Sequence, residues 1–289
     1  MGRARRLHEV YPPVSALANG RPSTVSLSIE QHGDVRRLRM VSMAGRGVRI
    51  DVSAYVFRGV MVDTGFHRAR RALVAAADAA GVRGVIVTHW HEDHAGNVAR
   101  LARRGMPMII GAETERMLRE RPEIQLYRRA IWGRPPALEH PVKAFESEEF
   151  ELVPTPGHSE DHQIVWHPET NTIFSGDLWL GVRTRTFHRA EDPYRVVGSL
   201  RLAAALCPER MFDAHRGLVE TPTVALLARA EWLASMLEEI ARRVAAGEEE
   251  DQILSEALGG EELAGFISRG EYSRRNLVRA VRRRLTRAS

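Results

Sequence analysis

Cysteine is almost absent from this chain of 289 residues, because Cys207 is the only one. A single cysteine excludes an internal disulfide and any metal site that is built from several thiolates. A metal ion bound by this chain would therefore have to be held by nitrogen and oxygen atoms. We expect Cys207 itself, in the stretch LAAALCPER, to be an inert thiol buried on a helix.

Long apolar runs are also missing from the sequence. None approaches the roughly 18 residues that are needed to span a bilayer, and no apolar segment follows the basic start MGRARR as a secretory signal would require. These absences predict a cytoplasmic protein without membrane contact. Apolar residues still make up 44% of the chain, which is enough to bury a sizeable core.

Lysine is nearly missing as well. Lys143 is the only lysine among 42 basic residues, so 42 − 1 = 41 of them are arginine, a ratio that indicates a coding bias. The arginines are interleaved with 37 acids and are densest at 3–6 and 279–287, which we interpret as a solvated face or a tail. Despite the net charge of +5, nucleic acid is therefore disfavoured as a partner but is kept as an alternative. A homodimer is kept as a further alternative.

Short apolar runs and turn residues predict an alternating order of strands and helices. The segment 125–144 carries several prolines and is expected to be an irregular loop or lid, and the last forty residues look charged and helical. This order favours a layered α/β protein with sheets inside and helices outside. The predicted strands cover 35–44, 48–57, 82–89, 106–111, 150–158, 163–177 with a turn at PETN, and 210–215, and the predicted helices cover 67–81, 97–105, 112–122, 196–206 and 224–246.

Five short motifs carry the metal-capable side chains. They are VDTG with Asp63, HWHEDH over 89–94, PTPGHSEDH with His158, SGD with Asp177, and DAHRG with His215. Each follows a predicted strand, which would gather them at one edge of the domain, where loops on a rigid scaffold usually carry chemistry. Five histidines and two aspartates exceed the four ligands of a closed zinc site. The set matches two metals that share a bridging carboxylate.

In this order the motifs resemble the metallo-β-lactamase-fold hydrolase superfamily, which includes glyoxalase II, lactonases and tRNase Z. The HxHxDH element stands here as HWHEDH, and TPGHS, SGD and AHRG follow it, so the resemblance covers about 60–217. It implies a four-layer αββα sandwich with the metals at one edge, extended here by small C-terminal helices. The chain would then divide into a tail (1–22), a catalytic domain (23–235) and a C-terminal helical extension (236–289).

The resemblance also implies a role for each motif residue. It further implies two bound divalent metal ions, for which zinc is favoured over iron or manganese. Asp63 would orient metal ligands through hydrogen bonds from behind them. His162 is interpreted as structural or as a second such residue, since Asp161 stands where relatives have a small residue. The first metal would be held by His89, His91 and His158, and the second by Asp93, His94 and His215, with Asp177 as the bridge and with Asp93 and Asp177 as the catalytic carboxylates.

Three further polar residues near the motifs receive minor roles. Glu92, between the ligands in sequence, is expected to point away and to be solvated or to cap a helix. His188 and Tyr194 lie in a segment shortly after Asp177, and such loops can line pockets. We therefore regard these two as candidates for substrate contact.

The predicted chemistry is hydrolysis, because two adjacent cations lower the pKa of a shared water and make hydroxide available at neutral pH. Relatives that hydrolyse lactams carry cysteine, serine or another residue where this chain has Asp177, and lactonases often have a tyrosine where it has Leu180. We predict a glyoxalase-II-like or lactonase-like enzyme that hydrolyses a small-molecule ester, thioester or lactone. The alternatives are a phosphodiesterase or ribonuclease acting on nucleic acid, and a metal-stabilised binding protein.

Overall fold

The computed structural model describes residues 25–44 and 48–288. They form two compact units, a first unit ending at Glu148 and a second unit beginning at Glu149. The predicted tail 1–22 and the basic cluster at 3–6 lie outside the described residues. Among the helices of the described part of the chain, none is both long and apolar enough to cross a membrane.

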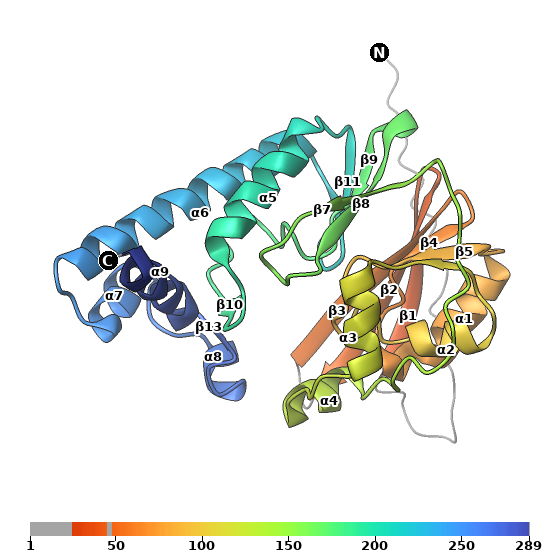
Figure 1. Ribbon diagram of the computed structural model, residues 1–289, viewed down its shortest axis with the longest axis horizontal. Coiled ribbons are helices and arrows are strands. Elements are labelled where there is room, and N and C mark those ends of the chain that lie inside the picture. The colour runs from red at the N-terminus through yellow and green to blue at the C-terminus, as the bar shows by residue number, and fades with distance from the viewer. Residues whose placement is uncertain (1–24, 45–47, 289) are drawn as a thin grey trace, which may run out of the picture. The chain divides into compact units, whose positions relative to one another are not determined.

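The first unit contains a six-stranded sheet in which the strands follow one another in sequence order (Figure 1). β2 and β3 have the predicted bounds and pair antiparallel over their whole length, with Val35 opposite Phe57. β4, β5 and β6 are parallel to one another. The strands are β1 (Val25–His32), β2 (Val35–Ala44), β3 (Val48–Phe57), β4 (Val60–Val62), β5 (Gly84–Ile86) and β6 (Met108–Ile109).

Helices of the first unit follow the parallel strands. Helix α1 buries Leu73 and Ala77, which are four residues apart and so lie on one face. The prediction of an irregular segment over 125–144 is wrong in part, since helix α4 forms there and ends at Gly133, whose φ of 86° suits a residue without a side chain. The helices are η1 (His67–Ala69), α1 (Arg70–Ala79), α2 (Val98–Arg103), α3 (Ala112–Glu120) and α4 (Leu126–Trp132).

The second unit contains a five-stranded sheet in the order β12-β11-β9-β8-β7 and a separate pair, β10 with β13. β9 and β11 are parallel, and the other neighbours are antiparallel. The predicted PETN turn joins β8 to β9, with Asn171 in the left-handed region. The strands are β7 (Glu151–Pro154), β8 (Gln163–His167), β9 (Thr172–Phe174), β10 (Phe187–His188), β11 (Arg210–Asp213), β12 (Gly217–Val219) and β13 (Tyr272–Ser273).

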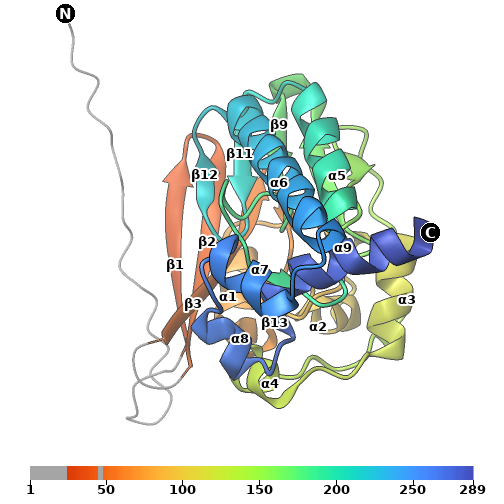
Figure 2. The same cartoon turned by 90° about the vertical axis from the view of Figure 1, so that its left-hand side faces the viewer.

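Helices of the second unit pack on one face of this sheet. Ile164, Ile173 and Met211 come from neighbouring strands and share a buried apolar cluster with Leu200 of α5 and Leu233 of α6. Figure 2 shows α5 and α6 running side by side. The predicted domain boundary at residue 235 falls inside α6. The helices are η2 (Pro168–Thr170), α5 (Pro193–Ala205), α6 (Pro222–Ala245), α7 (Glu250–Glu256), α8 (Leu263–Ile267) and α9 (Arg275–Ala288).

Cys207 is neither buried nor helical, so this prediction is wrong. The residue is exposed and lies beyond the end of α5, with a φ of 49°. The cause is Pro208, because a proline disfavours helical conformation in the residue before it. Asn171 then holds the turn by donating a hydrogen bond from Nδ2 to the carbonyl oxygen of Cys207 at 2.7 Å.

Candidate metal centre

Two parallel strands of the first unit bring the VDTG motif beside the histidine motif. Val62 of β4 pairs with Ile86 of β5, so the residues that follow each strand meet at the same edge of the sheet. There Asp63 Oδ1 accepts hydrogen bonds from the backbone N–H of Thr88 at 2.8 Å and from its hydroxyl at 3.0 Å. Asp63 has a φ of 60°, a conformation that aspartate tolerates better than most residues.

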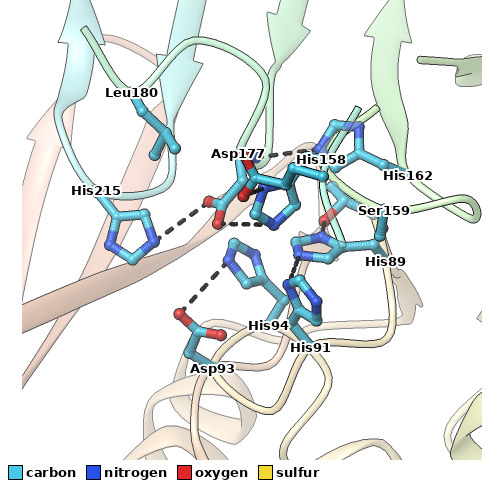
Figure 3. Close-up of polar contacts among 12 residues, drawn as sticks. His89, His91, Asp93, His94, His158, Ser159, His162, Asp177, Leu180 and His215 are labelled. Atoms are coloured by element: carbon cyan, nitrogen blue, oxygen red, sulfur yellow. Dashed lines mark hydrogen bonds and ion pairs between the residues drawn. The ribbon is translucent and has the colours of Figure 1, made fainter. Parts of the chain in front are cut away.

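The HWHEDH motif forms a tight turn that gathers three imidazoles (Figure 3). The ring centroid of His89 lies 4.7 Å from that of His91 and 4.2 Å from that of His94. The turn is closed by the backbone N–H of His94, which donates to the carbonyl oxygen of His91 at 3.0 Å. Asp93 places Oδ2 at 3.8 Å from Nε2 of His94. The four residues are buried, with exposed fractions of 8% or less.

Hydrogen bonds from behind the motif orient two of these rings. Nδ1 of His94 lies 2.8 Å from Asp63 Oδ2, and Nδ1 of His89 lies 3.0 Å from the hydroxyl oxygen of Thr88. A proton on Nδ1 of His94, donated to Asp63, leaves Nε2 with its lone pair. This is the arrangement in which a carboxylate fixes the tautomer of a metal-binding histidine.

The donors of the first unit fit a divalent cation. Nε2 of His89 and Nδ1 of His91 are 3.1 Å apart. Two nitrogen ligands on a tetrahedral zinc ion are separated by about 3.3 Å, given metal–nitrogen distances near 2.05 Å. Neutral imidazoles and a carboxylate are also the set that zinc, iron and manganese accept when thiolates are missing.

The end of the motif is anchored to the VDTG loop. Asn97 donates from Nδ2 to the carbonyl oxygens of Thr64 at 2.7 Å and Phe66 at 3.1 Å. Gly96 lies so close to this loop that an added Cβ would be 2.7 Å from the carbonyl oxygen of Gly65. The close approach explains why the motif continues with Gly-Asn, since only glycine lets the two backbones meet.

Glu92 is neither solvated nor a helix cap, which corrects the sequence-based expectation. It is 3% exposed and forms a double hydrogen bond with the guanidinium of Arg128, at 2.5 Å and 2.7 Å. Burial raises the pKa of the Glu92 carboxyl, and Arg128 opposes that rise. The partner comes from α4, whose existence the sequence did not predict. The pair therefore ties α4 to the histidine motif.

Three predicted ligands of the second unit also meet at one sheet edge (Figure 3). Asp177 follows β9 and His215 follows β11, and these two strands are parallel neighbours. The carboxylate of Asp177 lies between two rings: Oδ1 is 3.2 Å from Nε2 of His215, and Oδ2 is 3.4 Å from Nε2 of His158. A single carboxylate therefore faces two imidazoles with different oxygens.

His158 has a carboxylate partner that the sequence did not suggest. Nδ1 of His158 lies 3.0 Å from Oε1 of Glu191, and both side chains are buried. A proton on Nδ1 leaves Nε2, the atom that faces Asp177, with its lone pair. Glu191 is held next to Asp192, which caps α5 by accepting the N–H of Tyr194 at 3.0 Å. In the sequence, the Asp-Pro pair that begins this helix is the feature that could have drawn attention to Glu191 beside it.

Asp213 was also missed, although it stands two residues before His215. It is fully buried and accepts backbone hydrogen bonds from Leu180 at 3.0 Å, His215 at 2.9 Å and Arg216 at 2.8 Å. Burial raises the pKa of this carboxyl, and His215 opposes the rise. Asp213 therefore holds the backbone of the DAHRG turn and the segment after Asp177 together.

His162 contacts the backbone of Asp177. Its Nδ1 lies 2.9 Å from the hydroxyl oxygen of Thr155 and 3.1 Å from the carbonyl oxygen of the same residue. Its Nε2 accepts the backbone N–H of Asp177 at 3.1 Å. Both ring nitrogens are thus engaged with protein groups, as a structural role of His162 requires.

The two candidate substrate residues have different surroundings. His188 lies in β10 with Nε2 at 3.2 Å from Glu271 Oε1, while its Nδ1 accepts the N–H of Ala190 at 3.1 Å. Tyr194, at the start of α5, lines a cavity of about 710 Å³ in the second unit. Tyr194 is thus presented to a space that a ligand could enter, while both ring nitrogens of His188 are engaged with Glu271 and Ala190.

The sequence matches a family model described as the metallo-beta-lactamase superfamily over residues 48–210, more than half of the chain. A "beta-lactamase-like protein 2 homolog" of Drosophila melanogaster is 28% identical over 178 residues, which are 57% of this chain and 57% of that protein. A "lactamase-like protein nscB" of Trichophyton verrucosum is 30% identical over 136 residues, 47% of this chain and 42% of that protein. The chain thus spans about half the length of these curated relatives.

Solved structures resemble the fold over most of the chain. The crystal structure of DIM-1 metallo-β-lactamase exposed to ceftazidime superposes with a TM-score of 0.57 and 17% identity, over 72% of this chain and 97% of that one. At this identity the likeness concerns the fold alone. The matched range 48–210 includes every predicted ligand except His215.

Proposed function

The chain belongs to the metallo-β-lactamase superfamily, and on this premise we propose that it is a binuclear metal-dependent hydrolase of a small-molecule ester, thioester or lactone. The family and its α/β fold, with C-terminal helices, were predicted from the motifs and are confirmed. The same match supports the predicted enzyme class. The substrate and the number of metals are our proposal.

The proposed ligands are those that the resemblance assigns. The histidines are expected to bind through nitrogens that their protein partners leave unprotonated, as for Nε2 of His94 behind Asp63 and Nε2 of His158 behind Glu191. We favour zinc because imidazole and carboxylate donors suit it. The first cation would be held by His89, His91 and His158, the second by Asp93, His94 and His215, and both by Asp177.

The observation that carries the binuclear proposal is the position of Asp177. Its two oxygens face Nε2 atoms of two different histidines, His158 and His215, at 3.4 Å and 3.2 Å. In the proposed assignment these histidines serve different cations. A carboxylate so placed suits a bridge, in which each oxygen binds one cation, better than a ligand of a single ion.

When bound, two cations would supply a water whose pKa is lowered towards neutrality and a Lewis acid for the substrate oxygen. The residues of the chain hold and orient that centre. Asp63 and Glu191 fix imidazole tautomers, and the hydrogen bond from the Asp177 N–H to His162 fixes the backbone of the bridge. Because Asp177 stands where lactam-hydrolysing relatives carry cysteine, serine or another residue, a lactam is disfavoured as the substrate.

The test is the variant Asp177→Ala. We expect it to retain at most one cation per chain, compared with two in the unaltered protein, and to lose essentially all turnover on a panel of esters, thioesters and lactones. Metal content is measured by elemental analysis after purification and after reloading with zinc, iron or manganese. Full activity of the variant with one cation or none would contradict the binuclear proposal.

The matched control is His162→Ala, which removes a neighbour of Asp177 that is not assigned as a ligand. This variant should keep two cations per chain, because both nitrogens of His162 are engaged with protein groups. A loss of about 1–3 kcal/mol in the free energy of unfolding is expected from the unsatisfied N–H of Asp177. Loss of a cation would show that His162 is a ligand.

A further inference from the structure

Helix α9 builds one wall of the 710 Å³ cavity in the second unit. Ala280, Arg283, Arg284 and Arg287 line it, and their spacing (i, i+3, i+4, i+7) places them in one stripe along the helix. Arg189, which follows β10, adds a fourth guanidinium, and we call this cavity the arginine pocket. Its volume lies in the range of pockets that bind small molecules, roughly 300–1,000 Å³.

The acidic residues that line the arginine pocket are already engaged elsewhere. Glu160 pairs with Arg195, and Glu191 contacts Nδ1 of His158. Asp192 accepts backbone N–H groups at the start of α5. The lining has four guanidinium groups against three carboxylates, a formal charge of 4 − 3 = +1, and Glu160 is turned to Arg195, so the potential of the pocket stays positive.

The remaining arginines of α9 have partners within the second unit. Arg275 and Arg279 pair with Glu250, and Arg282 donates to the carbonyl oxygen of Glu248. No ion pair among residues 25–44 and 48–288 involves an arginine of the pocket. Of the α9 arginines, Arg275 and Arg279 are neutralised by Glu250, whereas the three that line the cavity keep their charge. Arg283, Arg284 and Arg287 are exposed, as the interpretation of this terminal cluster as a solvated face requires.

Tyr194 gives the pocket a fixed geometry. The guanidinium carbon of Arg284 lies 4.2 Å from the centre of the Tyr194 ring, a stacked arrangement that leaves the N–H groups at the edge of the guanidinium free to donate. Burial raises the pKa of the Tyr194 hydroxyl above its ordinary value, so the phenol stays protonated and can donate as well. The pocket therefore presents donors and no unengaged carboxylate to a ligand.

The arginine pocket lies next to a proposed metal ligand. Glu191 lines the cavity and also contacts His158 at 3.0 Å. We propose that the pocket binds the phosphate groups of the substrate, which is an acyl ester or thioester of a phosphorylated alcohol or thiol. The assignment of this ligand as part of the substrate rests on the proposed hydrolase function. Phosphate is preferred to carboxylate because four guanidinium groups match several negative charges, and each can bind phosphate oxygens in pairs.

A small ligand fits the pocket better than a nucleic-acid strand. Strand-binding proteins use an open basic groove that follows the backbone, often with several aromatic side chains for the bases. Here the lining includes the carboxylates of Glu160 and Asp192 as well as the basic stripe, and it has one aromatic side chain, Tyr194. A continuous polyanion crossing this site would pass both carboxylates.

Binding is tested first, without turnover, by calorimetric titration of the metal-depleted full chain with coenzyme A and with inorganic pyrophosphate. The double variant Arg283→Ala/Arg287→Ala should weaken the binding of both probes by at least about tenfold, because two charge-assisted contacts are lost. The control Arg279→Ala removes the same kind of charge from an α9 residue that pairs with Glu250 and does not line the pocket, and it should change the dissociation constants by less than about twofold. If the control weakened the binding of both probes equally, the proposal would be overturned, since the overall positive charge alone would then explain the binding.

Turnover is then compared on the metal-loaded chain with two thioesters of one acyl group. The KM for the coenzyme A thioester should be lower than that for the N-acetylcysteamine thioester by at least about tenfold, and the double variant should remove this advantage. Binding of glutathione, whose charges are carboxylates, as tightly as coenzyme A would overturn the preference for phosphate. Displacement of coenzyme A by a single-stranded RNA at equal concentration, with steep salt dependence, would overturn it in favour of nucleic acid.

These experiments distinguish a failure of the arginine pocket from a failure of the proposed hydrolase function. A chain that hydrolyses the uncharged thioester but binds neither coenzyme A nor pyrophosphate overturns the arginine pocket and leaves the proposed hydrolase function intact. Conversely, a chain that binds both probes through Arg283 and Arg287 but hydrolyses neither thioester nor any ester supports a phosphate site. That result overturns its assignment to a hydrolase substrate.

Discussion

At the scale of single residues, the orientation of the imidazoles depends on oxygen atoms behind them. Nδ1 of His94 faces Asp63, Nδ1 of His89 faces the hydroxyl of Thr88, and Nδ1 of His158 faces Glu191. Where a carboxylate accepts the Nδ1 proton, Nε2 must carry the lone pair. Such partners tune metal affinity, typically by 10- to 100-fold, without touching the metal.

The variant Asp63→Asn tests this dependence. Asparagine tolerates the left-handed φ of 60° and its oxygen can still accept from Thr88, but its amide would donate towards Nδ1 of His94. His94 would then carry its proton on Nε2 and lose its lone pair there. We expect the affinity for the second cation to fall by about 10- to 100-fold, measured by competition with a chromogenic chelator.

The variant Asp63→Ala separates the effect on the tautomer of His94 from the effect on the stability of the chain. Alanine is strained at this φ and removes the acceptor for Thr88, so this variant should lose more unfolding free energy than Asp63→Asn. It leaves His94 free to choose its tautomer, so its metal affinity should be no lower than that of the asparagine variant. Metal binding by Asp63→Asn as tight as in the unaltered chain would exclude an orienting role for Asp63.

The sequence could indicate the candidate ligands but not all of their partners. Asp63 was recognised because it stands in a short motif after a strand, and its contact with His94 follows from parallel pairing of β4 with β5. Glu191 lies far along the chain from His158 and in none of the five motifs, so only the folded chain reveals their contact. The same holds for Arg128, which reaches Glu92 from a helix that was not predicted.

At the scale of elements, prediction succeeded where a pattern is long. β2 and β3 have ten residues each and are separated in the sequence by Gly-Arg-Gly, and the predicted bounds agree with the structure. β10 and β13 have two residues each, too few for a period to be recognised. Helix α4 has seven residues, and the prolines after Gly133 concealed it. Such short elements form because tertiary contacts stabilise them, and the local sequence does not encode those contacts.

The loop that carries His158 depends on close packing against α5, which Gly157→Ala should disrupt. Gly157 has a φ of 136°, and an added Cβ would lie 2.5 Å from the backbone nitrogen of Val196. Because a backbone atom cannot move aside as a side-chain end can, we expect a loss of about 2 kcal/mol or more in the free energy of unfolding. Urea denaturation of the metal-depleted chain measures it.

Gly198→Ala is the matched control within α5. No atom lies within 4 Å of a Cβ added there, and the residue is exposed on the helix. Alanine should therefore stabilise the chain by up to about 1 kcal/mol through helix propensity. If both variants changed stability alike, the close approach of Gly157 to α5 would not determine the position of the loop.

Helix α4 should be coupled to the histidine motif through Glu92 and Arg128. Removing one member leaves a buried charge without its partner, so Glu92→Gln and Arg128→Met should each cost about 3–5 kcal/mol. The double variant leaves no buried charge at this place and should cost less than the sum of the two. Urea denaturation of the three variants without metal gives the coupling energy, and additive losses would show that the pair contributes nothing specific.

At the scale of the whole molecule, the proposed ligands run from residue 89 to residue 215 of the sequence. No short peptide of this chain contains them all, so an unfolded chain does not hold the seven ligands together for two cations. Metal that binds the folded chain and not the unfolded chain must stabilise the fold by mass action. Stability and metal content should therefore change together, whichever substrate the enzyme hydrolyses.

Thermal unfolding in the presence of zinc tests this coupling. At a free metal concentration a hundredfold above the dissociation constant, one site adds about 2.7 kcal/mol, which for a chain of this size raises the Tm by roughly 5–10 °C. Chelator should reverse the rise, and Asp177→Ala should reduce it, because the proposed bridge is lost. Glu92→Gln keeps all seven proposed ligands and should show a comparable rise from a lower starting Tm. An Asp177→Ala variant that gains as much Tm from zinc as the unaltered chain would place the stabilising metal elsewhere and contradict the proposed centre.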